Sequence, residues 1–157
     1  MKKLLAIVLL MVLCACMTAC TSGEYTKIGT SEFSIILPEG YAETEDEFDE
    51  DQIAYYFKDD QSVDFDVYQW DKEGKYTLEE EAEFFASEYD AVHEEVEING
   101  IKGMKYISKE TFEEKEYTVV NYMFEDEKSI IELCFWTVDT EEEYKAVEEI
   151  VGTIKKN

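Results

Sequence analysis

The residue types best suited to binding chemistry alternate along one short segment, residues 62–70. Val63, Phe65 and Val67 occupy every second position, which predicts the apolar face of a half-buried strand. The intervening positions carry acidic and aromatic residues: Asp64, Asp66, Tyr68 and Trp70. Such side chains on one strand face could bind a cationic or carbohydrate partner. We therefore expect a partner-binding face here. In the alternative interpretation the aromatic rings pack under a helix and the acids lie at an exposed end of the sheet.

The sequence offers little material for catalysis or for a transition-metal site. His93 is the single histidine, and three of the four cysteines fall within the first 20 residues. The fourth, Cys134, lies in an apolar segment, where a lone cysteine usually acts as a small buried hydrophobic residue. With 39 acidic residues, any fold brings some carboxylate pair to a distance suited to glycoside hydrolysis, so such a pair has no diagnostic value. We expect no catalytic residue, no metal ligand set and no cofactor, and we expect the protein not to be an enzyme.

The charge balance excludes one class of partner. Fourteen basic residues, all of them lysine, stand against 39 acidic residues, and the formal net charge is −25. Such a chain would be repelled by the phosphates of a nucleic acid, so we expect no nucleic-acid binding. The acid-rich segments 43–51 and 59–66 could attract Ca²⁺ weakly, although neither matches an EF-hand loop.

The first 20 residues predict where in the cell the protein is located. Lys2 and Lys3 precede ten apolar residues, 4–13, and then small residues and cysteines, a pattern typical of a secretory signal peptide over 1–19. Thr18-Ala19-Cys20 resembles the lipobox of bacterial lipoproteins, in which small residues precede the cysteine that is lipidated; Cys16 is the alternative site. Residues 20–27 would then form the lipid anchor and tether. This pattern predicts a protein held by its lipid at the extracytoplasmic face of the cell membrane.

Strand and turn signals predict how residues 28–157 position the segment 62–70 within a single domain. Strands are expected at 33–37, 53–58, 62–70, 96–98, 101–108, 117–124 and 130–138. Asn99-Gly100 predicts a two-residue hairpin between two of them. The segments 117–124 and 130–138 are apolar on both faces, which places them at the centre of a sheet covered on both sides. The acidic block 43–51 predicts a solvated loop.

Two capping boxes predict helices. Thr77 with Glu80 opens one helix that runs to about residue 92, and Thr140 with Glu143 opens a second that continues to about residue 154. Lys155 and Lys156 would lie at the carboxyl end of the second helix, where the helix dipole favours cations.

The order of strands, helix, strands and helix resembles the PsbP-like and Mog-like superfamily. The resemblance rests on the opening Phe33-Ser34-Ile35-Ile36-Leu37-Pro38-Glu39-Gly40-Tyr41, on the helix and hairpin over 78–107, and on the closing helix. It implies an α+β fold in which helices flank both faces of a mostly antiparallel sheet, an α/β/α sandwich. It also implies a non-catalytic binding or assembly accessory of the cell envelope, with an envelope protein as the expected partner. The second hypothesis is a lipoprotein that binds a ligand or a divalent cation, and the third is a small envelope enzyme.

Overall fold

The computed structural model describes residues 23–44, 51–58, 63–72, 76–89, 91–112 and 114–157. The predicted signal peptide, both candidate lipidation sites (Cys16 and Cys20) and most of the acid-rich segment 43–51 lie outside these residues. Within the described ranges, no helix is both long and apolar enough to cross a membrane.

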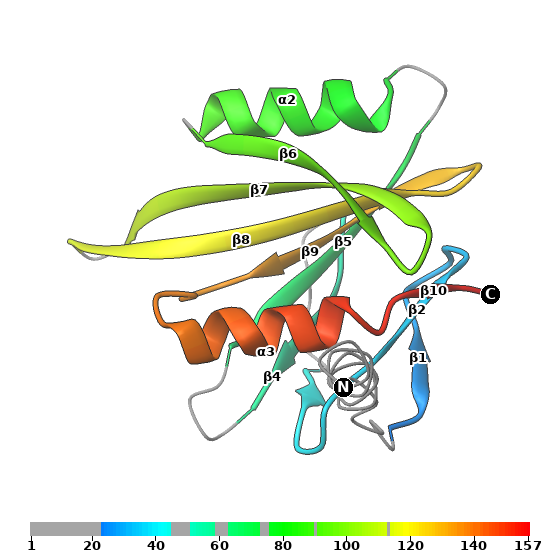
Figure 1. The fold of residues 1–157 in the computed structure, drawn as a ribbon, viewed down its shortest axis with the longest axis horizontal. Coiled ribbons are helices and arrows are strands. Elements are labelled where there is room, and N and C mark those ends of the chain that lie inside the picture. Colours follow the sequence, from blue (N-terminus) through cyan, green and yellow to red (C-terminus); the bar gives the residue numbers. More distant parts are fainter. Residues whose placement is uncertain (1–22, 45–50, 59–62, 73–75, 90, 113) are drawn as a thin grey trace, which may run out of the picture.

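A seven-stranded antiparallel sheet forms the centre of the fold (Figure 1). In spatial order its strands are β3 (Ala42–Glu43), β4 (Gln52–Phe57), β5 (Phe65–Asp71), β9 (Ser129–Phe135), β8 (Lys115–Glu125), β7 (Ile101–Phe112) and β6 (Val92–Ile98). Every residue of the middle strand, β9, is buried, which confirms the central position predicted for this segment. β9 ends earlier than predicted, because the chain turns at Thr137, whose φ is 57°.

One end of the acidic block 43–51 is not the predicted loop. Ala42 and Glu43 form the short edge strand β3, opposite Phe57 and Tyr56 of β4. The edge tolerates the glutamate because only one side of β3 is paired, and the other side meets water.

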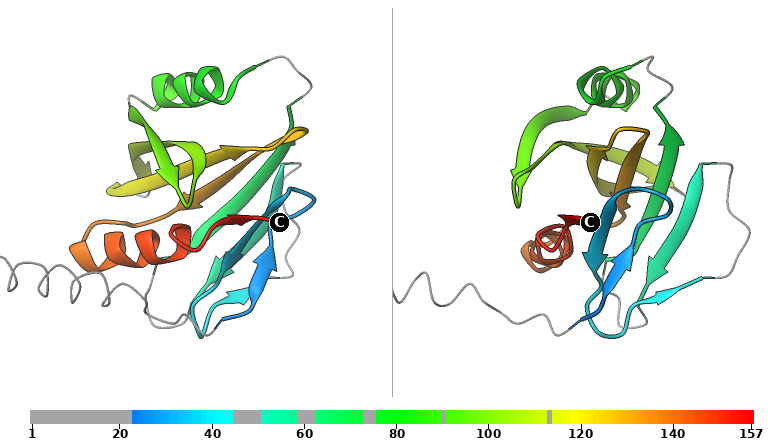
Figure 2. Two further views of the ribbon diagram at one scale, coloured as in Figure 1. Left: turned by 45° about the vertical axis from the view of Figure 1, so that its right-hand side comes forward. Right: turned by 90° about the vertical axis from the view of Figure 1, so that its right-hand side faces the viewer.

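A second, three-stranded sheet joins the two ends of the domain (Figure 2). Its strands are β1 (Tyr25–Lys27), the central β2 (Phe33–Ile36) and β10 (Lys155–Lys156). The predicted position of the two lysines at a helix end was therefore wrong. They pair instead with β2, and the Lys156 ammonium lies 2.8 Å from the Glu32 carboxylate.

The two predicted helices are present with both capping boxes formed. They are α2 (Leu78–Glu88) and α3 (Glu141–Val151). α2 was predicted to reach about residue 92, but Val92 already begins β6, where seven residues pair in register with β7. The strand pairing overrides the helical preference of this segment, as tertiary context commonly does.

The Asn99-Gly100 turn is confirmed, with φ of 54° and 78°. Positive φ at both positions suits the twist of a two-residue hairpin, and Ile98 lies opposite Ile101. The Asn99 side chain also donates hydrogen bonds to the carbonyls of Gly152 and Ile154 at 2.8 and 2.9 Å. The hairpin is thereby fixed to the segment that follows α3.

Two separate apolar clusters hold the helices to the sheet. The larger one joins α3 to β2, β4, β5, β8 and β9 through large side chains such as Phe33, Phe65, Leu133 and Phe135. The smaller one joins α2 to neighbouring side chains on β7, β8 and β9: Met104, Tyr106, Met123 and Ile130. The two helices and the antiparallel sheets of the described residues place the protein in the α+β class.

Candidate functional site

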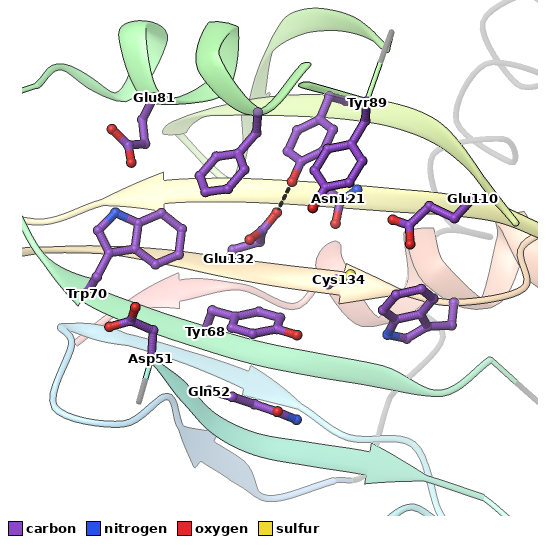
Figure 3. A pocket seen from close by; sticks show the side chains of 13 residues that line it. Asp51, Gln52, Tyr68, Trp70, Glu81, Tyr89, Glu110, Asn121, Glu132 and Cys134 are labelled. Carbon is purple, nitrogen blue, oxygen red and sulfur yellow. Dashed lines mark hydrogen bonds between the residues drawn. The ribbon is translucent and has the colours of Figure 1, made fainter. Parts of the chain in front are cut away.

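A cavity of about 610 Å³ lies beside the smaller cluster, between α2 and the strands β5, β9, β8 and β7 (Figure 3). Six of its lining residues are aromatic: Tyr68, Trp70, Phe85, Tyr89, Tyr106 and Trp136. Four are acidic: Asp51, Glu81, Glu110 and Glu132. Volumes between about 300 and 1,000 Å³ are typical of small-molecule sites.

The small side chains by which α2 packs explain why space remains beneath it. The buried residues of α2 are Leu78, Ala82 and Ala86, so most of the contact is made by methyl groups. Phe85 reaches further and lies between Trp70 and Tyr106, with ring centroids 5.8 and 6.4 Å away. This aromatic row supports one side of the cavity without filling it.

Glu132 of β9 is the most unusual group of the cavity. Its side chain projects into the cavity although the residue is only 6% exposed, and its Oε1 accepts a hydrogen bond from the Tyr106 hydroxyl (Figure 3). Burial raises the pKa of Glu132 to about 7, against the lowering effect of the Tyr106 hydrogen bond, and Asp66 and Glu110 raise it further. The pKa of Tyr106 is raised as well, first by burial and then by the Glu132 charge.

Asp66 lies behind the cavity wall rather than on an open surface. The residue is 8% exposed, its Oδ1 accepts a hydrogen bond from Gln52 Nε2 at 2.6 Å, and its Oδ2 accepts one from Trp136 Nε1. Burial raises the pKa of Asp66, the Trp136 hydrogen bond lowers it, and the Asp64 charge raises it. Asp66 therefore orients two residues of the cavity lining, Gln52 and Trp136.

The structure divides the predicted partner-binding face. Tyr68 and Trp70 line the cavity, and Trp70 packs against Phe85 of α2. Asp64 instead precedes β5 and accepts hydrogen bonds from the Tyr55 hydroxyl at 3.0 Å and the Lys58 amide at 3.4 Å. The two aromatic residues thus belong to a concave site under a helix, and the two acids serve the strands beside it.

Most residues that line the cavity were not predicted from the sequence to be binding residues. Glu132, Asn121 and Cys134 lie on strands interpreted only as apolar on both faces. A signal was present, because Glu132 and Asn121 each interrupt an otherwise apolar run. A polar residue within a fully buried strand requires a partner or a function.

The described residues contain no candidate metal site. Within the ranges that the structure covers, no group of three or more His, Cys, Asp and Glu side chains could hold a metal ion. His93 lies exposed on β6, away from the cavity lining. Burial raises the pKa of the Cys134 thiol well above its usual value, so Cys134 is a neutral thiol.

Solved structures share the fold. No protein-family model matches the chain, and no curated protein matches it in sequence. The solution structure of cyanobacterial PsbP (CyanoP) from Synechocystis sp. PCC 6803 aligns with a TM-score of 0.66 and 8% identity, over 90% of this chain and 96% of that one. A crystal structure from Bacteroides thetaiotaomicron VPI-5482 aligns with a TM-score of 0.64 and 19% identity, over 86% of this chain and 48% of that one, so this chain spans about half its length. The likeness confirms a PsbP-like fold, and at these identities it shows the fold alone.

Proposed function

We propose that this chain is a non-catalytic binding or assembly protein of the cell envelope, whose ligand or partner enters the cavity beside α2. The observation that carries the proposal is the cavity itself, with six aromatic rings and a buried carboxylate in its wall. Aromatic rings supply large contact areas at a low entropic cost, and a few fixed polar groups supply orientation. This is the usual composition of a binding site.

The absence of catalysis is part of the proposal and is supported by the chemistry of the lining. Nucleophilic catalysis requires a thiolate or hydroxyl beside a base. Cys134 is a buried neutral thiol, and the buried Glu132 is paired with the Tyr106 phenol, whose own pKa is raised. Both candidate nucleophiles of the described lining, the Cys134 thiol and the Tyr106 hydroxyl, are therefore held in their neutral form.

We further propose that the domain is an α/β/α sandwich of the PsbP-like and Mog-like type, with α2 and α3 as its outer layers. Residues adjacent in β9 support this arrangement. Ile131 packs in the cluster of α3 and Ile130 in the cluster of α2, and successive side chains of a strand point to opposite faces.

Attachment to the membrane through a lipid on Cys20, with Cys16 as the alternative, completes the proposal. The described chain begins at Gly23 and enters β1 at Tyr25, so few residues separate the anchor from the folded domain. Labelling cells with a palmitate analogue tests the anchor. Label is expected on the wild type and on Cys16→Ser and should be lost from Cys20→Ser; label retained by Cys20→Ser would contradict the assignment.

The test of the binding function is to identify what accompanies the protein from its own membranes. The tagged full-length chain is cross-linked and purified, protein partners are identified by mass spectrometry, and small ligands are released by denaturation and analysed in parallel. We expect a companion molecule with the wild type and with Tyr76→Ala, since Tyr76 is an exposed aromatic residue outside the cavity lining. Cys134→Phe, which fills the cavity, should lose that companion. Equal recovery from all three proteins, or no companion from any, would refute the proposed function.

A further inference from the structure

The charged side chains among the described residues that line the cavity are all acidic. Glu132 and the three other carboxylates of its lining are joined by Asp66, which lies directly behind the wall. No lysine is among the described residues that line it. Acidic groups of one sign in a concave wall concentrate a negative potential, which attracts cations.

Only one of the two carboxylate oxygens of Glu132 accepts a hydrogen bond from a described residue. One carboxylate oxygen accepts the Tyr106 hydrogen bond, and no other described residue donates a hydrogen bond to this carboxylate. The strand registers place Tyr68 and Met123 beside Glu132, so neither neighbouring strand brings a basic residue to this position. Burying a carboxylate without a partner is costly, and an apolar residue would fold more easily here. Because Glu132 lines the cavity, the second oxygen is available to a donor from a ligand that enters it.

The aromatic residues around Glu132 suit a positively charged donor. Tyr68, Trp70, Phe85 and Tyr106 come from β5, α2 and β7 and line the same cavity as Glu132. Ring faces attract ammonium and guanidinium groups, most strongly where water is excluded, and aromatic cages are the known solution for organic cations. Trp70 adds a further requirement, since its buried indole N–H has no hydrogen-bond partner among the described residues. A ligand that carries an acceptor on its stem would satisfy this group as well.

We infer that the cavity binds an organic cation, a primary ammonium or guanidinium group on an apolar stem, with the free oxygen of Glu132 as its anchor. This deepens the proposed function and rests on it. Two sources share this chemistry: a free amine, or the side chain of a lysine or arginine on a partner protein. The unpaired Trp70 N–H favours the second source, because a peptide carries carbonyl acceptors next to the side-chain stem.

Binding should strengthen as Glu132 ionises. The groups that face Glu132 are Tyr106 and Glu110 of β7, Asp66 of β5, Cys134 of β9 and Tyr89 at the end of α2; none is a cation, and Glu81 of α2 lines the same cavity. A bound cation would be the first positive charge in this set and would draw the proton off the glutamate. Affinity should therefore rise from about pH 6 to about pH 8.

The two tryptophans of the chain supply the readout, because both Trp70 and Trp136 line the cavity. The full chain in detergent is titrated with N-acetyl-lysine methylamide, and fluorescence is recorded. N-acetyl-norleucine methylamide, which has the four side-chain carbons of lysine but no ammonium group, serves as the uncharged control, and butylammonium serves as a free amine. We expect a saturable change with the lysine derivative and about tenfold weaker binding of the norleucine derivative, since a charge-assisted hydrogen bond separates the two. Tighter binding of the lysine derivative than of butylammonium assigns the cation to a protein partner, and the reverse assigns it to a free amine.

Glu132→Gln should abolish the preference for the cation and its pH dependence. Glu83→Gln is the matched control, because it removes the same charge from an exposed position of α2 outside the lining and should leave the preference intact. Equal affinity for the charged and neutral derivatives would overturn the cation inference and leave the proposed function standing. No response to any of the three compounds would also overturn it, whereas the proposed function is decided separately by the molecule recovered from the membranes.

Discussion

The two faces of β9 differ, since one packs in the main core and the other borders the cavity. Ile131, Leu133 and Phe135 are completely buried and pack in the cluster with α3. On the alternate positions of the same strand, Glu132 and Cys134 line the cavity beside α2. β5 repeats the division, since Phe65 and Val67 enter the α3 cluster and Tyr68 and Trp70 line the cavity.

The two helices differ in the same way as the faces that they contact. α3 buries Val147, Ile150 and Val151, which are branched side chains that fill space against large aromatic rings. α2 contributes two alanines among its three buried residues. Packing against α3 therefore uses larger side chains than packing against α2, and the cavity of about 610 Å³ lies on the α2 side.

The largest expected effect comes from truncating the packed face. Leu133→Ala should lower the free energy of unfolding by about 3 to 4 kcal/mol, because it removes a fully buried side chain and leaves a cavity. Cys134→Ala, one residue away but on the cavity side, should cost less than about 1 kcal/mol, since the thiol already borders open space. Urea denaturation followed by far-UV circular dichroism measures both. Comparable losses in the two variants would show that the two faces do not differ in packing.

The second largest expected effect is a stabilisation of the fold, and it comes from replacing the Glu132 carboxylate. The folded pKa of Glu132 is about 7, above the ordinary value of 4.5, so between these values the folded state binds more protons than the unfolded state. Stability contributed by the protonated glutamate is present below about pH 4.5 and is lost as the pH rises towards 7. Glu132→Gln removes this loss and should stabilise the protein by roughly 2 to 3 kcal/mol at about pH 8, with little difference near pH 4.5.

Thermal unfolding of the wild type and of Glu132→Gln across this pH range tests the sign. Glu83→Gln should not reproduce the effect, because Glu83 is exposed. A Glu132→Gln variant less stable than the wild type at pH 8 would mean that the buried carboxylate stabilises the fold, and its assignment as a binding group would lose its support.

The sequence predicted those features of the fold that depend on a local residue pattern. Both capping boxes, the Asn99-Gly100 hairpin and the central position of β9 follow from short-range chemistry and are present. The end of α2 was wrong because residues 92–98 pair with β7, a contact that no local preference reveals. Lys155 was misplaced for the same reason, since its partner, Ser34, lies more than a hundred residues away in the sequence.

The site was less accessible to sequence reasoning than the fold. Tyr68 and Trp70 were singled out, but their neighbours in the cavity come from α2, β7, β8 and β9, and only the sheet order brings these segments together. Glu132 stands in the run Ser129–Phe135, where one acidic residue among apolar ones has little weight until its burial is known. Asp64 and Asp66 alternate as a surface pair would, yet hydrogen bonds from Tyr55, Gln52 and Trp136 occupy them.

The smallest expected effect distinguishes the helices themselves. Thr77 and Thr140 cap α2 and α3 in the same way, with side-chain oxygens 3.2 Å from the amides of Glu80 and Glu143. Replacing either threonine by alanine should cost its helix about 1 kcal/mol.

Because α3 packs in the main core, Thr140→Ala should lower the stability of the whole domain. Thr77→Ala should instead act mainly on α2, which packs in the smaller, separate cluster and can open without global unfolding. Hydrogen exchange followed by mass spectrometry should show faster exchange confined to 78–88 in Thr77→Ala, and a loss of protection throughout the sheet in Thr140→Ala. Identical exchange patterns would mean that α2 is as firmly bound as α3, and that a ligand must enter the cavity without any movement of the helix.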